Sequence, residues 1–573
     1  MTPDQVFAEM VAEGDLVLGQ LDARARDMPD KTYLHYGEDG LKLSFAQVRE
    51  RSSRIAAGLQ PGQPVSVLTR NSLLAALAMF GIWRAGGVYA PVNFNFRGPL
   101  LSYQLNDTAP FALITDPSFA AALGEVAGSI TLRRLVVHHP AEGEHDFDAA
   151  PAGTDFAGFD CTALSALMAS GHPVPQIIVV PQDVANIVYT SGTTGPSKGV
   201  VQPYRWMNHY AYPGRQLTHA DDVIYCDLPM YHVGGAFYLV VRALWQGNTV
   251  GLWDRFSPTQ FWQRIADCGA TNAVLLDVMV PWLMSAAPQA DDRANTLNKV
   301  HMQPLPANHH EVAQRFGFDT VTAGFGQTES GSGFAGVIDE FPGREGTPAA
   351  LWRGLPKADI LARCQAIGRR VVDGSQALPR GFMGRPNPLF EVALLDEQDN
   401  RVPPGTVGQL AFRPRFPGLI LLEYFRKPEA TQKVLRNCWF HTGDACRELD
   451  DGSGVFVFVD RMGGFFRVRG ENVSSYEVEA LIAGHPAVRA VAALPIPAQV
   501  GEEDDIVAFV ELREGQAASL DALREHAAGV MPRYMQPRHW RIVAALPVTP
   551  NNKVEKYKLK QAILAELGMA ARL

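Results

Sequence analysis

The sequence contains few cysteines, no strongly basic segment and no long apolar run, and each shortage excludes a class of protein. Its six cysteines in 573 residues show neither a Cys-x-x-Cys pair nor a Cys/His metal-ligand spacing, so no disulfide framework is expected. Lys and Arg number 51 against 60 Asp and Glu, and a net charge of −9 gives no overall attraction for nucleic acid or an anionic membrane. Apolar stretches end at Arg84 and Arg242, short of the about 18 residues of a membrane span.

The amino-terminal residues also lack a targeting pattern. MTPDQVFAEM has no positively charged segment followed by an apolar one, so a secretory signal is not expected. Together with the scattered cysteines, this predicts a soluble protein in the reducing cytoplasm.

The pattern of apolar residues predicts an α/β protein with two parts. Up to about residue 385, helix-like segments such as 45–59 and 73–85 alternate with strand-like ones, which favours parallel sheets. Short strands divided by Gly and Pro then predict an antiparallel β subdomain at roughly 385–460. After residue 460 the pattern is that of a small α+β unit, so we predict domains at 1–460 and 461–573. The strands expected in the first part are 64–69, 87–92, 177–180, 186–190, 222–228, 272–276 and 320–324.

One loop carries the chemistry of a polyphosphate site. It is Tyr-Thr-Ser-Gly-Thr-Thr-Gly-Pro-Ser-Lys-Gly at 189–199, directly after an apolar strand. Its glycines allow close backbone approach, its hydroxyls can donate to phosphate oxygens and its lysine adds a positive charge. Ser197 precedes the lysine and Gly199 follows it, so it is not a Walker A loop. The predicted phosphate ligands are Thr190, Ser191, Gly192, Thr193, Thr194, Gly195 and Lys198.

This loop resembles the phosphate loop of the adenylate-forming superfamily, which includes acyl-CoA synthetases, stand-alone adenylation domains and firefly-type luciferases. Further motifs resemble that family and follow in its order. They are Leu-Pro-Met-Tyr-His-Val-Gly-Gly at 228–235, Gly-Phe-Gly-Gln-Thr-Glu at 324–329, Phe-His-Thr-Gly-Asp at 440–444, the segment from Asp460-Arg461 to Val473, and Pro-Val-Thr-Pro-Asn-Asn-Lys at 547–553. The resemblance implies a large adenylation domain and a mobile carboxyl-terminal domain.

The resemblance implies roles for the nucleotide residues. Glu329 would hold Mg²⁺ against the ATP phosphates and Thr328 would be catalytic beside it, although a glutamate alone is more often a solvated surface charge. Phe325, at the position where the family usually has tyrosine, and Gly326 would contact adenine. Asp444 would accept hydrogen bonds from the ribose hydroxyls with help from Arg461.

The acid pocket is expected around the second motif. The resemblance assigns to this pocket His232, Val233, Gly234, Met302 and Gly324. From the sequence alone, His232 could equally well be a histidine buried in the core. Since the candidate walls are apolar and show no counter-charge for an amine, we predict a bulky apolar carboxylic acid rather than an amino acid. These walls are Val233, Phe237, Val278, Met279, Trp282 and Met302.

The carboxyl-terminal unit would supply residues both to the formation of an acyl-adenylate and to its reaction with a thiol. Lys553, otherwise an ordinary surface lysine, would bridge the acid and the α-phosphate, and Gly464 is the implied hinge. The segment 469–474 is similar to carnitine/crotonobetaine-CoA ligases and fatty-acid-transport-type synthetases. It favours CoA as the thiol, with Arg469, Gly470 and Glu471 as its ligands.

Three features depart from the family pattern. The hinge position, usually aspartate or lysine in the family, is Gly464. His-Met-Gln-Pro-Leu-Pro at 301–306 replaces the usual Gly-Gly-Ala-Pro loop, which leaves nucleotide contacts there undefined. The segment 330–382 is longer than usual, and residues 359–371 are expected to form an extra helix over the acid site.

The function predicted from these residues is ATP-dependent acyl-CoA synthesis, with Mg²⁺ as cofactor and ATP and CoA as co-substrates, in fatty-acid or lipid metabolism. A carboxylate attacks ATP to give acyl-AMP, and CoA then displaces AMP. Two alternatives stay open: a stand-alone adenylating enzyme that loads a carrier protein, and a relative that does not adenylate or performs one half-reaction. The sequence leaves open whether the chain forms a homodimer.

Overall fold

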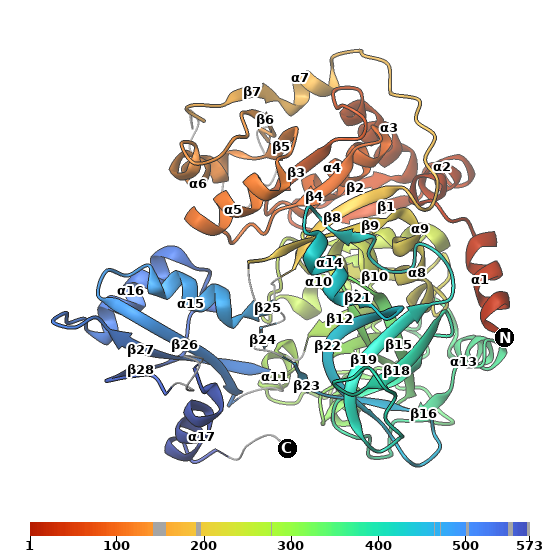
Figure 1. Ribbon diagram of the computed structural model, residues 1–573. Helices are drawn as coiled ribbons and strands as arrows, with labels where there is room; N and C mark the ends of the chain where they lie inside the picture. Colours follow the sequence, from red (N-terminus) through yellow and green to blue (C-terminus); the bar gives the residue numbers. More distant parts are fainter. Residues whose placement is uncertain are drawn as a thin grey trace.

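The computed structural model describes residues 1–140, 156–190, 196–276, 278–462, 465–469, 471–499, 503–547 and 554–569. A large amino-terminal body contains two sheets, and a small carboxyl-terminal part lies beside it at lower left (Figure 1). The predicted α/β fold class, with a large sheet domain and a small second domain, is confirmed.

The larger sheet is parallel at its centre and antiparallel toward its ends. Strands β11, β10, β12, β13 and β14 run parallel, whereas β15 pairs antiparallel with β14. Antiparallel pairing on this side of the sheet therefore begins at residue 331, before the predicted bounds of 385–460. Its strands are β1 (Thr32–Tyr36), β2 (Leu41–Ser44), β10 (Val223–Cys226), β11 (Thr249–Leu252), β12 (Asn272–Leu276), β13 (Lys299–Gln303), β14 (Thr320–Gln327), β15 (Gly331–Asp339), β16 (Val371–Asp373), β17 (Phe382–Pro386), β18 (Phe390–Leu395), β19 (Val407–Pro414), β21 (Leu435–Arg436), β22 (Trp439–Glu448) and β23 (Phe456–Arg461).

The second sheet has the order β20-β9-β8-β4-β3-β5-β6-β7. Its strands run parallel from β8 to β7, and β9 turns back antiparallel on β8, so the predicted phosphate loop connects two adjacent strands. The strands are β3 (Pro64–Leu68), β4 (Val88–Pro91), β5 (Ala112–Thr115), β6 (Arg134–Val137), β7 (Asp160–Ala163), β8 (Val184–Thr190), β9 (Lys198–Pro203) and β20 (Glu423–Tyr424).

Helices cover these sheets and fill the space between them. The helices of the large body are α1 (Pro3–Ala12), α2 (Val17–Asp27), α3 (Phe45–Ala56), α4 (Ser72–Arg84), α5 (Gly98–Thr108), η1 (Pro117–Phe119), α6 (Ala120–Val126), α7 (Leu164–Met168), α8 (Tyr204–Arg215), η2 (Gly234–Val241), α9 (Ala243–Gln246), α10 (Phe261–Cys268), α11 (Met279–Met284), α12 (His309–Phe316), α13 (Lys357–Ala366) and α14 (Pro428–Val434). Within the described residues, no helix is both long enough and apolar enough to cross a bilayer.

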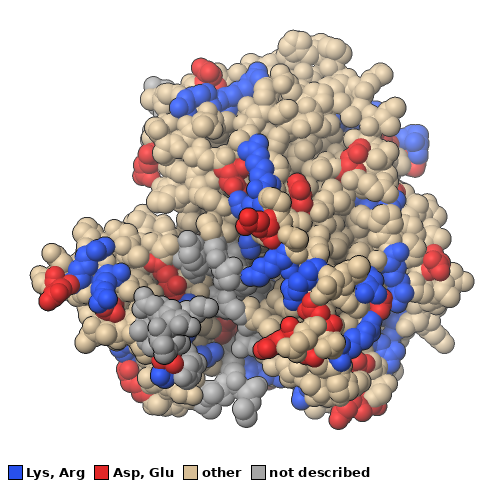
Figure 2. Space-filling model, in the orientation of Figure 1, with Lys and Arg blue, Asp and Glu red and all other residues tan. Residues whose placement is uncertain are grey.

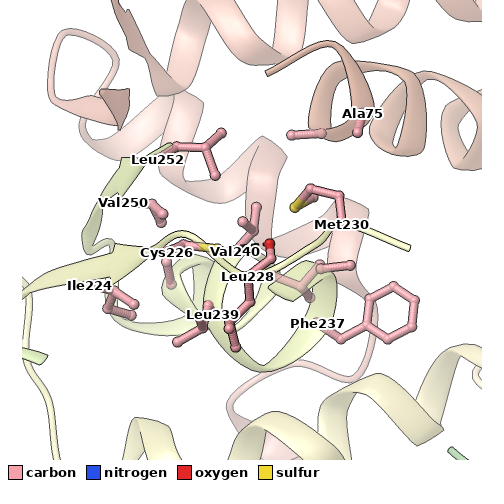
Figure 3. Close-up of a cluster of buried hydrophobic side chains, with 14 of the residues drawn as sticks. Ala75, Ile224, Cys226, Leu228, Met230, Phe237, Leu239, Val240, Val250 and Leu252 are labelled. Atoms are coloured by element: carbon pink, nitrogen blue, oxygen red, sulfur yellow. Dashed lines mark hydrogen bonds between the residues drawn. The ribbon is translucent and has the colours of Figure 1, made fainter. Parts of the chain in front are cut away.

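The main hydrophobic core joins the two sheets. Helix α4 is buried from Ser72 to Trp83 because it packs on α3, β3 and β4. Its Phe80 ring also lies 6.0 Å from the ring of Tyr33 in β1 of the larger sheet. In Figure 3, Ala75 of α4 lies above Met230, with Leu252 of β11 and Phe237 of η2 in the same cluster. Burial of this apolar surface fixes the positions of η2 and of the segment before it.

The carboxyl-terminal part consists of a hairpin and a three-stranded sheet with helices. Its elements are β24 (Phe465–Val468), β25 (Glu471–Ser474), α15 (Ser475–Ala483), β26 (Val488–Pro497), β27 (Asp504–Leu512), α16 (Leu520–Val530), η3 (Arg533–Met535), β28 (His539–Val543) and α17 (Lys556–Glu566). It contacts the large body through the amide nitrogen of Asn93, which donates to the Tyr534 hydroxyl at 3.0 Å.

One expected strand is absent. Residues 177–180 form no strand, and Ile178 is 94% exposed. Pro173, Pro175 and Pro181 flank this apolar segment, and prolines offer no N–H to a neighbouring strand. The expected extra helix at 359–371 exists as α13 but ends at Ala366, and the chain turns two residues later at Gly368, which has a φ of 72°. None of the α13 residues lines the cavity predicted to hold the acid; Ile360 and Cys364 pack instead with Leu217 and Val337.

Candidate active site

A cavity of about 380 Å³ lies between the larger sheet, η2 and the β24–β25 hairpin. His232, Val233, Gly234 and Gly324, four of the predicted acid-pocket residues, line it. So do the predicted nucleotide residues Phe325, Gly326 and Thr328. The geometry therefore brings the second and third motifs together around one cavity.

Two glycines allow the chain to approach itself closely here. A Cβ on Gly235 would lie 2.6 Å from the carbonyl oxygen of Pro229, and one on Gly324 would lie 2.5 Å from that of Phe334. Both distances are shorter than real contacts, so these positions require glycine. This is why η2 can start directly under the 228–233 segment and why β14 can pass so close to β15.

Met302, the fifth predicted pocket residue, does not line the cavity. It is buried in the core, whereas its neighbours His301 and Gln303 face the cavity. Side chains alternate along a strand, so adjacent residues of β13 point to opposite faces. Phe237, a predicted wall, belongs to the buried cluster that Figure 3 shows. It is not among the residues that line the cavity.

The predicted phosphate residues that the structure describes lie next to Glu329. Thr190 at the end of β8 pairs with Lys198 at the start of β9, and the Thr190 hydroxyl donates to Glu329 Oε1 at 3.2 Å. The hydroxyl of Tyr424 donates to the same oxygen at 3.0 Å. Two strands and a turn thus place a hydroxyl, a lysine and a carboxylate together.

The turn at 328–330 is held from behind by β9 and α8. Gln202 Nε2 donates to the carbonyl oxygen of Thr328 at 2.7 Å, and Trp206 Nε1 donates to that of Glu329 at 3.3 Å. His209 Nε2 lies 3.1 Å from the carbonyl oxygen of Ser330. Burial lowers the pKa of His209 to about 4, so this histidine is neutral near pH 7. The carboxylate of Glu329 is therefore positioned by a rigid backbone.

Lysines lie near this turn, and one of them, Lys427, forms an ion pair with Asp107 at 2.6 Å. Burial lowers the pKa of Lys198. The charges of Lys427 and Lys433 lower this pKa further, and the carboxylate of Glu329 opposes the shift. The Lys198 Nζ also lies 5.1 Å from the centre of the Tyr424 ring. Figure 2 shows Lys and Arg side chains gathered in the middle of this face, next to the carboxyl-terminal part. Such a surface favours a polyanionic ligand.

The predicted nucleotide carboxylate is buried in β22. Gln327 Nε2 donates to Asp444 Oδ2 at 2.6 Å and to the carbonyl oxygen of Thr442 at 3.1 Å. Asp444 pairs with Arg461 in the register of β22 and β23, and the side chain of Arg461 lies outside what the structure describes. Phe325 packs edge-on against Phe334, with 6.2 Å between ring centres.

The β24–β25 hairpin closes the other side of the cavity. Arg469 and Glu471 line it, and Glu471 accepts a hydrogen bond from the Tyr231 hydroxyl at 2.6 Å. Its other oxygen lies 3.0 Å from His232 Nε2. Burial would raise the pKa of Glu471, but His232, Tyr231 and Arg467 together hold it below its ordinary value. The His232 side chain is 37% exposed, so it is not a core histidine.

Some predicted residues lie outside the described part of the chain. They are Ser191, Gly192, Thr193, Thr194, Gly195, Gly464, Gly470 and Lys553. The sequence analysis missed Tyr424 and Gln327 as partners of Glu329 and Asp444. Gln327 stands inside a recognised motif, which could have identified it, whereas Tyr424 has no such signal.

The residues near Glu329 show which kind of magnesium site is possible here. Among the described residues, no group of three or more His, Cys, Asp or Glu side chains could hold a metal. Magnesium is usually bound by one or two carboxylates together with substrate phosphates and water. A single carboxylate beside Thr190 and Lys198 fits an ion that arrives with a nucleotide, and does not fit one held by protein alone.

Known proteins share this sequence pattern over nearly the whole chain. It is 26% identical to a crotonobetaine/carnitine–CoA ligase from Salmonella arizonae, over 90% of this chain and 93% of that protein. It is 27% identical to a medium/long-chain-fatty-acid–CoA ligase from Mycobacterium tuberculosis, over 94% of this chain and 84% of that protein.

The fold is also that of o-succinylbenzoate CoA synthetase from Bacillus subtilis. That structure gives a TM-score of 0.73 at 20% identity and covers 94% of this chain and 97% of its own.

Two family models match the chain. The model described as AMP-binding enzyme matches residues 21–417, and the one described as AMP-binding enzyme C-terminal domain matches residues 477–553. Neither match ends at residue 460, so the domain boundary stays a prediction. The resemblance to adenylate-forming enzymes is confirmed, and the chain belongs to the AMP-binding enzyme family.

Proposed function

We propose that this enzyme is an ATP-dependent acyl-CoA synthetase for a bulky, largely apolar carboxylic acid. The main support is that one cavity is lined both by Thr328, from the turn at 328–330, and by Arg469 and Glu471 of the β24–β25 hairpin. An acid in this cavity has a polyphosphate site on one side and the carboxyl-terminal hairpin on the other. The curated relatives named above, both CoA ligases, support CoA as the thiol.

In the first step, a carboxylate oxygen attacks the α-phosphorus of ATP, the bond to the bridging oxygen breaks and pyrophosphate leaves. Thr190 and Lys198 bind the phosphates, and Asp444 holds the ribose. Glu329 would hold magnesium together with the nucleotide, and the bound ion would supply charge neutralisation. Lys553 stabilises the charge that develops between the acid and the α-phosphate. Catalysis of this kind depends on positioning and electrostatics.

In the second step, the CoA thiolate attacks the acyl carbonyl and AMP leaves with the electron pair of the anhydride bond. The hairpin seats Glu471 against Tyr231 and His232, so Arg469 faces the same cavity that holds the acyl group. This arrangement suits entry of the thiol, with Gly464 as the hinge that brings the hairpin into place.

The walls of the cavity support an apolar acid. Val233, Val278, Met279 and Trp282 line it as predicted, and Trp282 stacks on Phe256 with 5.7 Å between ring centres. Such surfaces favour a large apolar group.

Two carboxylates that the sequence analysis missed also border the cavity, Asp227 and Asp254. Asp254 accepts hydrogen bonds from the Tyr36 hydroxyl and the Ser72 backbone N–H. Burial raises the pKa of Asp227 to about 6, against the opposing effect of Arg264. With a pKa of about 6, Asp227 is still mostly ionised near pH 7, so it adds to this wall a negative charge that the sequence did not predict. The amino-acid arm of the screen below tests whether that charge is used.

A thioester screen tests the proposal. With ATP, magnesium and CoA, we expect thioester from bulky aliphatic, aromatic or polycyclic acids and none from amino acids. Loading of a carrier protein with no use of CoA would favour the first alternative. Absence of pyrophosphate exchange with every acid would favour a relative that does not adenylate.

Glu471→Gln should slow the thiol step selectively. Its charge-assisted hydrogen bonds to Tyr231 and His232 hold the hairpin at the cavity. A hydrogen bond of this kind contributes roughly 1.5–3 kcal/mol, so the rate with supplied acyl-AMP and CoA should fall about 10-fold or more. Pyrophosphate exchange should change little, as should both reactions in Glu514→Gln, an exposed glutamate of the same unit. Equal loss in both reactions would show that Glu471 has no selective role.

A further inference from the structure

A second cavity, of about 210 Å³, adjoins the first. The two share four lining residues: Pro213, Ala335, Gly336 and Arg369. The second cavity extends toward α1, where Met1 and Val6 line it. Arg369 therefore stands where the two cavities meet.

Arg369 lies in the segment 330–382, which the resemblance predicts to be longer than usual in the family. Helix α13 ends at Ala366, and Gly368, with its φ of 72°, turns the chain so that Arg369 reaches the cavities. Its Nη1 donates to the carbonyl oxygen of Pro213 at 3.0 Å. One hydrogen bond of this kind uses one of the five N–H donors of a guanidinium.

The surroundings of Arg369 offer it no negative charge. Burial lowers its pKa, and the groups that act on it electrostatically are the thiol of Cys364 and the hydroxyls of Tyr238 and Tyr212. Within the described ranges, no Asp or Glu forms an ion pair with Arg369. A guanidinium nevertheless stays protonated in proteins, so a positive charge lacks a counter-ion at this point.

The neighbouring polar groups are neutral. The Tyr238 ring lies 5.3 Å from that of His301, whose Nδ1 is 3.0 Å from the Thr322 hydroxyl and whose Nε2 is 3.1 Å from Gln303 Oε1. Burial lowers the pKa of His301 to about 4, so it carries no charge near pH 7. In the second cavity, Arg370 and Arg385 add positive charge, and no described lining residue is acidic.

We propose that Arg369 binds an anionic group at the far end of the acid substrate, so that the preferred substrates are long acids with a second carboxylate. A carboxylate matches the fork of a guanidinium with two parallel hydrogen bonds and supplies the missing counter-charge. The apolar walls bind the chain between the two ends. This inference rests on the proposed function, and it deepens that function by naming the substrate class.

Matched pairs of acids test it. We compare octanedioate, dodecanedioate and hexadecanedioate with the monocarboxylates of equal length, in the wild type, Arg369→Gln, Arg369→Lys and the control Arg353→Gln, an exposed arginine of the same segment. Arg369→Gln should lower kcat/KM at least about 30-fold for the best dicarboxylate and less than about 3-fold for its monocarboxylate. Arg369→Lys should restore part of the loss, and the control should behave like the wild type.

The outcomes separate this inference from the proposed function. If Arg369→Gln lowered kcat/KM equally for the dicarboxylate and its monocarboxylate, Arg369 would only hold Pro213 in place. If the wild type used both acids equally well, the enzyme would not recognise the distal charge. Either result overturns this inference and leaves the proposed function intact. If the wild type forms no thioester at all, the proposed function fails. In that case, calorimetry of dodecanedioate binding still tests the inference about Arg369. Binding by the wild type that is lost in Arg369→Gln supports it. Binding that is unchanged in the variant, or no binding by the wild type, overturns it.

Discussion

Lys553→Ala should nearly abolish acyl-AMP formation while leaving the thiol step largely intact. Its ammonium is expected to enter the site in the adenylating orientation and to stabilise charge at the α-phosphate. In the arrangement described here, the β24–β25 hairpin lines the cavity. Loss of one preorganised charge contact costs about 3–4 kcal/mol, so acid-dependent pyrophosphate exchange should fall about 100- to 1000-fold.

The same variant should still convert supplied acyl-AMP and CoA to thioester within about 3-fold of the wild-type rate. Lys558→Ala, which removes an exposed lysine of α17, is the matched control and should change neither reaction. Equal damage to both reactions would indicate a general defect in folding or binding. An unchanged exchange rate would return Lys553 to an ordinary surface lysine.

Glu329→Gln should lower pyrophosphate exchange about 100-fold and raise the magnesium concentration needed for half-maximal activity. The amide keeps an oxygen that can accept from Thr190 and Tyr424, and the backbone of the turn stays fixed by Gln202 and Trp206. The substitution therefore removes charge with little change of shape.

The control for Glu329 is Glu423→Gln, an exposed glutamate in the adjacent β20. It should match the wild type in exchange rate, magnesium requirement and thermal unfolding. If Glu329→Gln lost activity but kept the wild-type magnesium requirement, its carboxylate would act in some way other than by holding the ion.

Local patterns were sufficient to predict most elements near the site. Helix α3 starts at Phe45 because Ser44 caps it: its hydroxyl accepts from the Gln47 N–H at 3.3 Å while the Gln47 side chain accepts from the Ser44 N–H. The α+β pattern predicted after residue 460 is present, with α15 at 475–483, and β8 leads into the phosphate loop. These features depend on neighbours within a few residues.

Features that depend on distant contacts could not be predicted. Tyr424 reaches Glu329 because β20 pairs with β9. Arg369 lines the cavity because α13 ends at Ala366, five residues before the expected end at residue 371. Met302 was assigned to the pocket because its motif is there, but the register of β13 decides which of three consecutive residues face inward. None of these outcomes follows from spacing alone.

The most direct test of the whole account is the product balance of one reaction. Purified protein with ATP, magnesium, CoA and an accepted acid should yield thioester, AMP and pyrophosphate in equal amounts, and omission of CoA should leave enzyme-bound acyl-AMP. Formation of ADP and phosphate, or of thioester without AMP, would contradict the adenylate-forming mechanism proposed here.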